Sequence, residues 1–217
     1  MCRATRTVFA LALFAGLSRN AWADSTTWRS DGASDGVRVD RRDVPGSSFD
    51  ELRLSIVSSL GLQSLCDAIY PTKLPARLDR RFKKQELLRE TRTERWTYEQ
   101  ISVPVVSDRD YVMHVKLEQG AASGHCAVSF QTEQDPARPP VPGFVRIPVI
   151  RGHWDAFPIA DGNVSVQYRI FSEPGGGVPA FLTRGSQRSA AVDFMKIILA
   201  RATLAPRSGD ATPGATP

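Results

Sequence analysis

The chain has 217 residues, and its 28 lysine and arginine side chains outnumber its 23 acidic ones, which gives a formal net charge of +5 at pH 7. This length suits one domain around a single core, and the middle of the sequence contains nothing that resembles a linker. Nucleic-acid binding is not expected, because it needs a sustained basic stripe and the chain has only one dense basic cluster: Arg77, Arg80, Arg81, Lys83 and Lys84. This cluster fits an ordinary solvated surface better than a docking patch for anionic lipid headgroups.

The N-terminus has the features of a secretory signal. Two arginines precede an apolar run over residues 8–17, and Ala21-Trp22-Ala23 fits a small-x-small cleavage site. We therefore expect residues 1–23 to be removed near Ala23, leaving an exported protein, periplasmic or secreted. The leader contains three arginines and no acid, so 25 basic and 23 acidic side chains remain after cleavage. The alternative is a buried N-terminal helix.

The first part of the mature chain predicts a hairpin and a helix. Val37 and Val39 follow an Asp-Gly turn, and Leu52 to Ile56 alternates between apolar and polar side chains. Ser58 or Ser59 can cap the helix that follows. Its apolar face would be formed by Leu62, Leu65, Cys66 and Ile69.

The middle of the chain predicts a series of antiparallel strands. A weak edge strand covers 82–90, and stronger ones cover 94–103, 109–118, a run from Cys126, and a run from Val145. Together with an early and a final helix, these strands predict an α+β fold.

The last part of the chain contains a strand, a turn and a long helix. Val164 to Ile170 alternates with period two, and prolines and three successive glycines then interrupt it over 172–179. An apolar helical stripe follows, formed by Ala191, Phe194, Met195, Ile198 and Ala202. The remaining segment, 205–217, lacks apolar bulk and is predicted to be disordered.

Three features in this order resemble the START domains, the steroidogenic-acute-regulatory-related lipid-transfer modules. They are a strand over 101–112 with Pro104 and an Arg-Asp-Tyr-Val step, a turn and strand over 152–158, and the closing strand, glycine turn and helix. The likeness covers Trp28 to Ala202. It implies a START-like domain over 24–204 with a helix-grip fold, in which a curved antiparallel sheet wraps around the long C-terminal helix and encloses an apolar tunnel. It also implies a gate, made by the loop Gly120–Gly124 and the start of the last helix.

No recognisable catalytic or metal-binding set appears in the sequence. His114, His125 and His153 lack the spacing of zinc ligands, and there is no Gly-x-Ser-x-Gly motif. We therefore predict no catalytic residue, metal or cofactor. The pair Arg109-Asp110 is interpreted as two anchors for neighbouring loops rather than as a ligand contact, because adjacent strand residues point to opposite faces.

Two cysteines, Cys66 and Cys126, remain after the leader is removed. Exported proteins form disulfides. Both cysteines have apolar neighbours, which favours buried free thiols over a bridge.

The predicted ligand-binding residues are the apolar side chains that alternation or helical spacing places on inward faces. Any sandwich or barrel has such a set, so sequence alone does not separate a filled core from a tunnel, and only the resemblance favours the tunnel. The set is Trp96, Tyr98, Met113, Val115, Val128, Phe130, Ile147, Tyr168, Phe194, Met195 and Ile198. Some sterol-binding START members place an arginine in the tunnel; the corresponding position here is Val115, which leaves the ligand class open.

Three functions remain open. The favoured one is a monomeric lipid-binding or lipid-transfer protein that holds a sterol, phospholipid or other apolar ligand without catalysis and makes transient contact with a membrane surface. The second is an enzyme of the polyketide cyclase type, with polar residues converging in the tunnel: Trp96, Tyr98, Gln100, His153 or Tyr168. The third is an accessory protein that has a filled core and binds a partner through the basic cluster. The shortage of acid–base sets favours the first.

Overall fold

The computed structural model describes residues 27–71, 81–103 and 107–204. The predicted leader (1–23) and tail (205–217) lie outside these residues. So do Pro104 and two members of the basic cluster, Arg77 and Arg80.

The described residues form a ten-stranded sheet with two α-helices, which confirms the predicted α+β fold. The strands are β1 (Arg29–Ser34), β2 (Val37–Asp43), β3 (Asp50–Ser58), β4 (Phe82–Glu90), β5 (Glu94–Ile101), β6 (Arg109–Gln119), β7 (Cys126–Glu133), β8 (Val145–Arg146), β9 (Val149–Pro158) and β10 (Val164–Glu173). The helices are α1 (Leu62–Ile69) and α2 (Ala180–Leu204), and two short 3₁₀ turns are η1 (Ala121–Ser123) and η2 (Ala160–Gly162).

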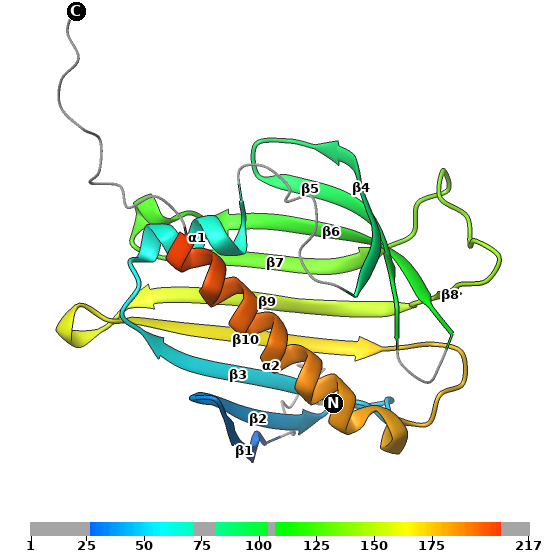
Figure 1. The fold of residues 1–217 in the computed structure, drawn as a ribbon, viewed down its shortest axis with the longest axis horizontal. Coiled ribbons are helices and arrows are strands. Elements are labelled where there is room, and N and C mark those ends of the chain that lie inside the picture. Colours follow the sequence, from blue (N-terminus) through cyan, green and yellow to red (C-terminus); the bar gives the residue numbers. More distant parts are fainter. Residues whose placement is uncertain (1–26, 72–80, 104–106, 205–217) are drawn as a thin grey trace, which may run out of the picture.

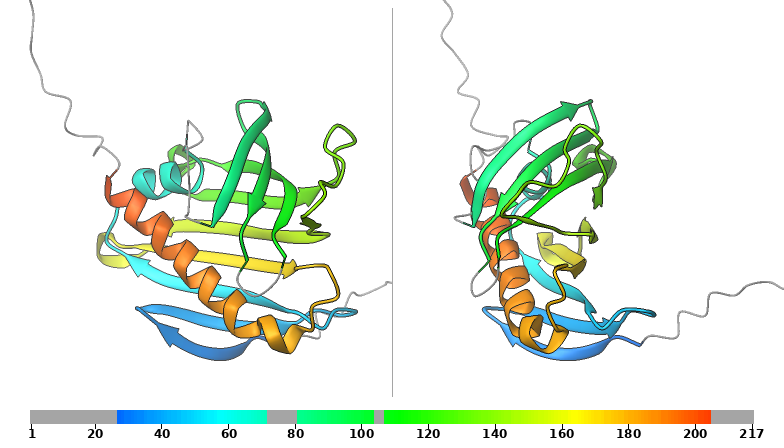
Figure 2. Two further views of the ribbon diagram at one scale, coloured as in Figure 1. Left: turned by 45° about the vertical axis from the view of Figure 1, so that its right-hand side comes forward. Right: turned by 90° about the vertical axis from the view of Figure 1, so that its right-hand side faces the viewer.

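The sheet has the order β1-β2-β3-β10-β9-β7-β6-β5-β4, with antiparallel neighbours throughout, and β8 pairs with β6 in parallel. The sheet curls toward α2, which lies across its concave face (Figures 1 and 2). This is the predicted helix-grip arrangement. We call the face toward α2 the inner face and the opposite face the outer face.

The second half of helix α2 packs on the apolar core. The predicted stripe is buried at Ala191, Met195, Ile198 and Ala202. The first turn exposes Phe181 (74%) and Leu182 (64%). The apolar spacing therefore begins only where the helix meets the core.

Helix α1 is joined to the sheet by a disulfide between Cys66 and Cys126. The prediction of two free thiols is wrong. Packing of α1 on β7 and β9 brings the two Cα atoms to 5.6 Å, a separation that suits a disulfide. The bridge closes a segment of 60 residues, which in the chain-entropy account stabilises the fold by about 4 kcal/mol.

The inward prediction for Trp96 and Tyr98 is also wrong. Trp96 lies opposite His114 in the β5–β6 register and stacks on it at 4.1 Å, on the outer face. Tyr98 is only 2% exposed, yet its hydroxyl donates to Asp110, also on the outer face. The segment between β7 and β8 lies over this part of the outer face, where Arg146 and Arg138 approach Asp110 and Tyr98. Because this part of the outer face is covered, its strands carry buried aromatic side chains there, and their sequence pattern resembles that of strands facing the core.

Candidate ligand-binding site

The inner face under α2 is filled by aromatic side chains. Trp154 on β9 stacks on Tyr168 of β10, with ring centroids 4.1 Å apart, and the ring of Phe194 from α2 lies 6.1 and 5.9 Å from them. Met195 and Ile198 of α2 are buried against the same cluster. This part of the interior is packed core.

The inner face of β4–β6 is different, because it carries polar side chains. Thr97 and Glu99 on β5 are 2% and 6% exposed, and Tyr111 on β6 is 5% exposed. The hydroxyl of Thr97 and the amide of Gln85 each donate to Oε1 of Glu99 at 2.9 Å. The hydroxyl of Tyr111 is hydrogen-bonded to the same carboxyl group. We call Gln85, Thr97, Glu99 and Tyr111 the inner polar cluster.

Burial raises the pKa of Glu99, and the hydrogen bonds from Tyr111, Gln85 and Thr97 oppose that rise only in part. Burial, followed by the charge of Glu99, also holds the pKa of Tyr111 well above its ordinary value. A carboxyl with a raised pKa keeps its proton to higher pH and can then donate a hydrogen bond. Oε1 of Gln85 is buried without a hydrogen-bond partner. The cluster thus has spare capacity for a polar group.

A pocket of about 600 Å³ lies between α2 and the residue before β4. It is lined by Arg81, Asp193, Lys196, Ile197 and Ala200. The positive charge of Arg81 acts against the rise in the pKa of both Tyr111 and Tyr168, which burial causes. The pocket therefore shares Arg81 with the electrostatic surroundings of Tyr111, but none of the residues of the inner polar cluster lines it.

No family model matches the chain. An uncharacterized protein of Pseudomonas aeruginosa is 29% identical over 192 residues, which cover 88% of this chain and 92% of that protein. The structure of a STAR-related lipid transfer protein from Xanthomonas axonopodis matches with a TM-score of 0.70 and 27% identity, over 81% of this chain and 98% of that one. Human StAR-related lipid transfer protein 5 matches with a TM-score of 0.71 and 18% identity, over 84% and 89%.

The chain has the START-like helix-grip fold. The resemblance inferred from the sequence is thereby confirmed. No helix among the described residues is both long and apolar enough to span a membrane. Within the same residues, no three histidine, cysteine or acidic side chains gather as metal ligands would.

The predicted ligand-binding residues lie in three different parts of the structure. Val128, Tyr168, Phe194, Met195 and Ile198 belong to the packed core under α2. Met113 and Ile147 belong to a smaller cluster with Tyr111 and Ile150, and Val115 and Phe130 contact both clusters. Trp96 and Tyr98 lie on the outer face. The residues nearest the inner polar cluster are therefore those of the smaller cluster.

The predicted loop anchors and gate have different outcomes. Arg109 donates to the backbone carbonyl of Pro174 at 3.3 Å, and Asp110 accepts two bonds from Arg146 at 2.9 Å, so both residues fix loops as predicted. The two predicted gate segments, however, lie near opposite ends of α2 (Figure 1). They cannot close one opening.

Sequence reasoning missed Gln85, Thr97 and Glu99. They were overlooked because Trp96 and Tyr98, which alternate with Thr97 and Glu99, were assigned to the inner face. The signal that could have found them is the register: Thr97 lies opposite Met113, which was predicted to face inward, and Glu99 lies opposite Tyr111, two residues away on the same face of β6.

Proposed function

We propose that this chain is a carrier that holds an apolar small molecule inside its START-like fold and delivers it without chemical change. The ligand would lie on the inner face of β4–β7, beside Met113, Val115 and Phe130, with its polar end at Glu99. Apolar contacts would supply most of the affinity, at about 0.8 kcal/mol for each buried CH₂ group.

The observation that carries this proposal is the inner polar cluster. Glu99 and Tyr111 are buried on the inner face of the sheet, no cation is bonded to Glu99 among the described residues, and Oε1 of Gln85 has no partner. Buried polar groups are normally satisfied, and groups with a perturbed pKa gather at functional sites, so an unpaired oxygen beside such a carboxyl is accounted for by a ligand. A hydroxyl or amide at the end of an apolar ligand would satisfy this group. A sterol fits that description through its hydroxyl, and a fatty acid fits it through the O–H of its protonated carboxyl group.

Export is part of the proposal. The disulfide between Cys66 and Cys126 supports it, because stable disulfides belong to oxidising compartments. A carrier between membranes needs contact with them, and the exposed pair Phe181 and Leu182 at the start of α2 offers an apolar contact of that kind.

One observation favours a second candidate, an enzyme on the same scaffold. A buried carboxyl with a raised pKa beside a tyrosine is also what a general acid requires. In that case Glu99 would transfer a proton to the ligand rather than only bind it.

Native mass spectrometry of the purified mature protein, with solvent extraction of bound molecules, tests the proposal. We expect an adduct that yields one class of lipid, and that returns unchanged after incubation with fresh protein. A chemically altered molecule after incubation would establish the enzyme instead. A bare mass after exposure to a mixed lipid panel would contradict both.

A further inference from the structure

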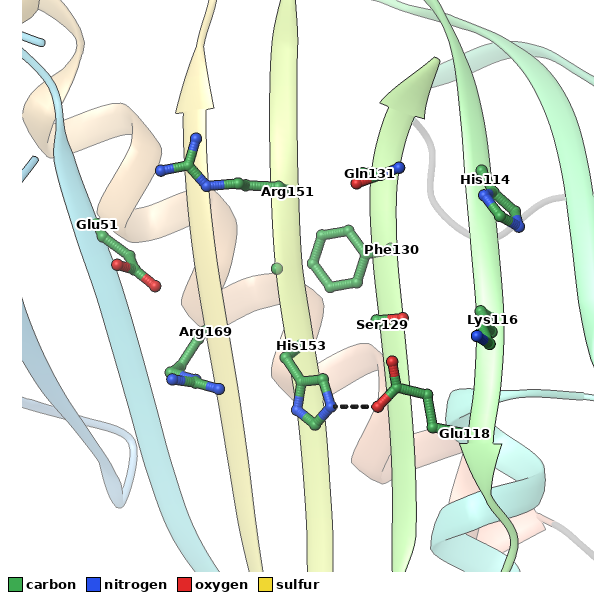
Figure 3. Close-up of a pocket in the computed structure, with 11 residues that line it drawn as sticks. Glu51, His114, Lys116, Glu118, Ser129, Phe130, Gln131, Arg151, His153 and Arg169 are labelled. Atoms are coloured by element: carbon green, nitrogen blue, oxygen red, sulfur yellow. Dashed lines mark hydrogen bonds and ion pairs between the residues drawn. The ribbon is translucent and has the colours of Figure 1, made fainter. Parts of the chain in front are cut away.

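The outer face of the sheet carries a groove of about 500 Å³ that has no part in the interior site. It runs across β6, β7, β9 and β10, with α2 behind the sheet (Figure 3). Gly152 on β9 and Phe130 on β7 lie opposite each other in the strand register and form part of its floor. The ring of Phe130 itself lies on the inner face, 5.9 Å from the ring of Tyr168.

Three permanent cations line the groove: Lys116 on β6, Arg151 on β9 and Arg169 on β10. Within the part of the chain that the structure describes, none of them has a carboxylate at ion-pair distance. Arg151 lies over the ring of Phe171 at 4.3 Å. The two acids that line the groove are already engaged, Glu51 by Arg42 at 2.7 Å and Glu118 by His153 at 3.4 Å. The groove therefore has an excess of positive charge.

The position of Arg169 is electrostatically unfavourable in the sheet. The strand register places it directly between Arg53 on β3 and His153 on β9. Arg53 is balanced by Asp40, with Nη2 and Oδ2 2.9 Å apart, but Arg169 has no such partner among the described residues. Like charges opposite one another destabilise a sheet. A bound anion would neutralise this repulsion, so the unpaired charge of Arg169 favours anion binding.

We propose that this groove is a second ligand site, for a small soluble anion that carries a phosphate group. The guanidinium groups of Arg169 and Arg151 would bind phosphate oxygens in bidentate fashion, and Lys116 would add a third charge. The volume is typical of a small-molecule site, whereas a flat bilayer surface does not follow a recess. The proposal does not depend on what the interior holds.

Inorganic pyrophosphate is the probe for this test. Isothermal titration at physiological salt should show one saturable site on the mature protein. Arg169→Gln and Arg151→Gln should each weaken binding by tenfold or more. Arg89→Gln is the matched control, because Arg89 is an exposed arginine on the outer face of β4 and does not line the groove.

Thermal unfolding supplies a second readout that does not depend on heats of binding. Without ligand, Arg169→Gln should melt at the same temperature as the wild type or higher, because it relieves like-charge repulsion. Pyrophosphate should raise the melting temperature of the wild type and of Arg89→Gln but not that of Arg169→Gln.

Two results would overturn the proposal. One is the absence of saturable pyrophosphate binding, or an equal loss in Arg89→Gln. The other comes from phosphatidylglycerol vesicles in a co-sedimentation assay. If vesicle binding depends on Arg169 while pyrophosphate does not bind, the groove is part of a membrane-docking surface and not a small-molecule site.

Discussion

Two buried carboxyl groups on neighbouring strands make an instructive pair. Asp110 on β6 faces outward, is fully buried, and accepts bonds from Arg146 at 2.9 Å and from Tyr98 at 3.0 Å. Glu99 on β5 faces inward and is hydrogen-bonded only to neutral groups: Tyr111, Gln85 and Thr97. Burial acts to raise the pKa of both, but the hydrogen bonds from Arg146 and Tyr98 hold that of Asp110 below its ordinary value. The charge of Asp110 is balanced by Arg146, and this pair fixes a loop. Glu99 has no cationic partner among the described residues, so the inner polar cluster remains available to a ligand.

The largest change in the free energy of unfolding is expected at Asp110. Asp110→Asn removes the partner of Arg146 in a buried ion pair, and breaking such a pair costs about 3–5 kcal/mol. Urea unfolding should show this loss, and Asp108→Asn, which removes an exposed pair with Lys83, serves as the control. A loss at Asp110 below about 1 kcal/mol would mean that the outer cluster does not hold the loop.

The disulfide is the next test, because it secures the end of the inner face that lies under α1. Cys66→Ser combined with Cys126→Ser should lower the free energy of unfolding by about 2–4 kcal/mol. The inner polar cluster lies on other strands, so the double variant should still bind ligand at a temperature where it is folded. Loss of ligand from a folded double variant would show that the two ends of the inner face are coupled.

The two carboxyl groups should affect pH dependence with opposite signs. The lowered pKa of Asp110 adds stability above its unfolded value of about 3.9, and this stability is lost as the pH falls through the lower folded pKa. The raised pKa of Glu99 costs stability once the pH rises above its unfolded value of about 4.3, up to the folded pKa. Glu99→Gln should therefore gain stability relative to wild type as the pH rises from about 4 toward neutrality.

Denaturant titrations of wild type and Glu99→Gln at several pH values measure this difference. Glu86→Gln is the control, because Glu86 lies opposite Tyr98 on the outer side and its hydrogen bond with Lys84 lowers its pKa, so it should leave the wild-type pH profile unchanged above pH 5. A Glu99→Gln profile parallel to wild type would mean that the Glu99 carboxyl titrates as a surface acid does.

The smallest effect is expected at Trp96. Trp96→Phe removes the hydrogen bond from the indole to Glu133, at 2.9 Å, and part of the stack on His114. The cost should be about 1 kcal/mol, the size of one hydrogen bond. Ligand affinity should not change, because Trp96 lies on the outer face. If Trp96→Phe lowered the ligand affinity in an equilibrium binding assay, Trp96 would be part of the ligand-binding site after all.

The sequence was sufficient for the fold class and for most of the elements, although no pattern predicted β1. Spacing along α2 predicted the buried stripe of Ala191, Met195, Ile198 and Ala202, and alternation predicted the strands, because burial on one face imposes those periods. Alternation gives the residues that share a face, but not which face meets the core. The error at Trp96 and Tyr98 arose there, because the segment between β7 and β8 covers the outer face and needs aromatic side chains beneath it.

The site was harder to predict than the fold for a related reason. Glu99 lies in a run whose apolar members point the other way, so its burial depends on strand pairing and not on local pattern. The disulfide is similar: Cys66 and Cys126 are 60 residues apart, and only the packing of α1 on the sheet brings them together. The periodicity of a single sequence predicts individual helices and strands, but it does not predict which of them contact one another.

The central claim, that the inner polar cluster holds the polar end of an apolar ligand, is tested most directly by one set of affinities. The extracted ligand is titrated into delipidated wild type, Glu99→Leu, Glu99→Gln and Glu94→Leu. We predict a loss of about tenfold for Glu99→Leu, the value of one hydrogen bond, with affinity largely kept in Glu99→Gln and unchanged in Glu94→Leu. Equal affinities for all four proteins, each shown to be folded, would contradict the account.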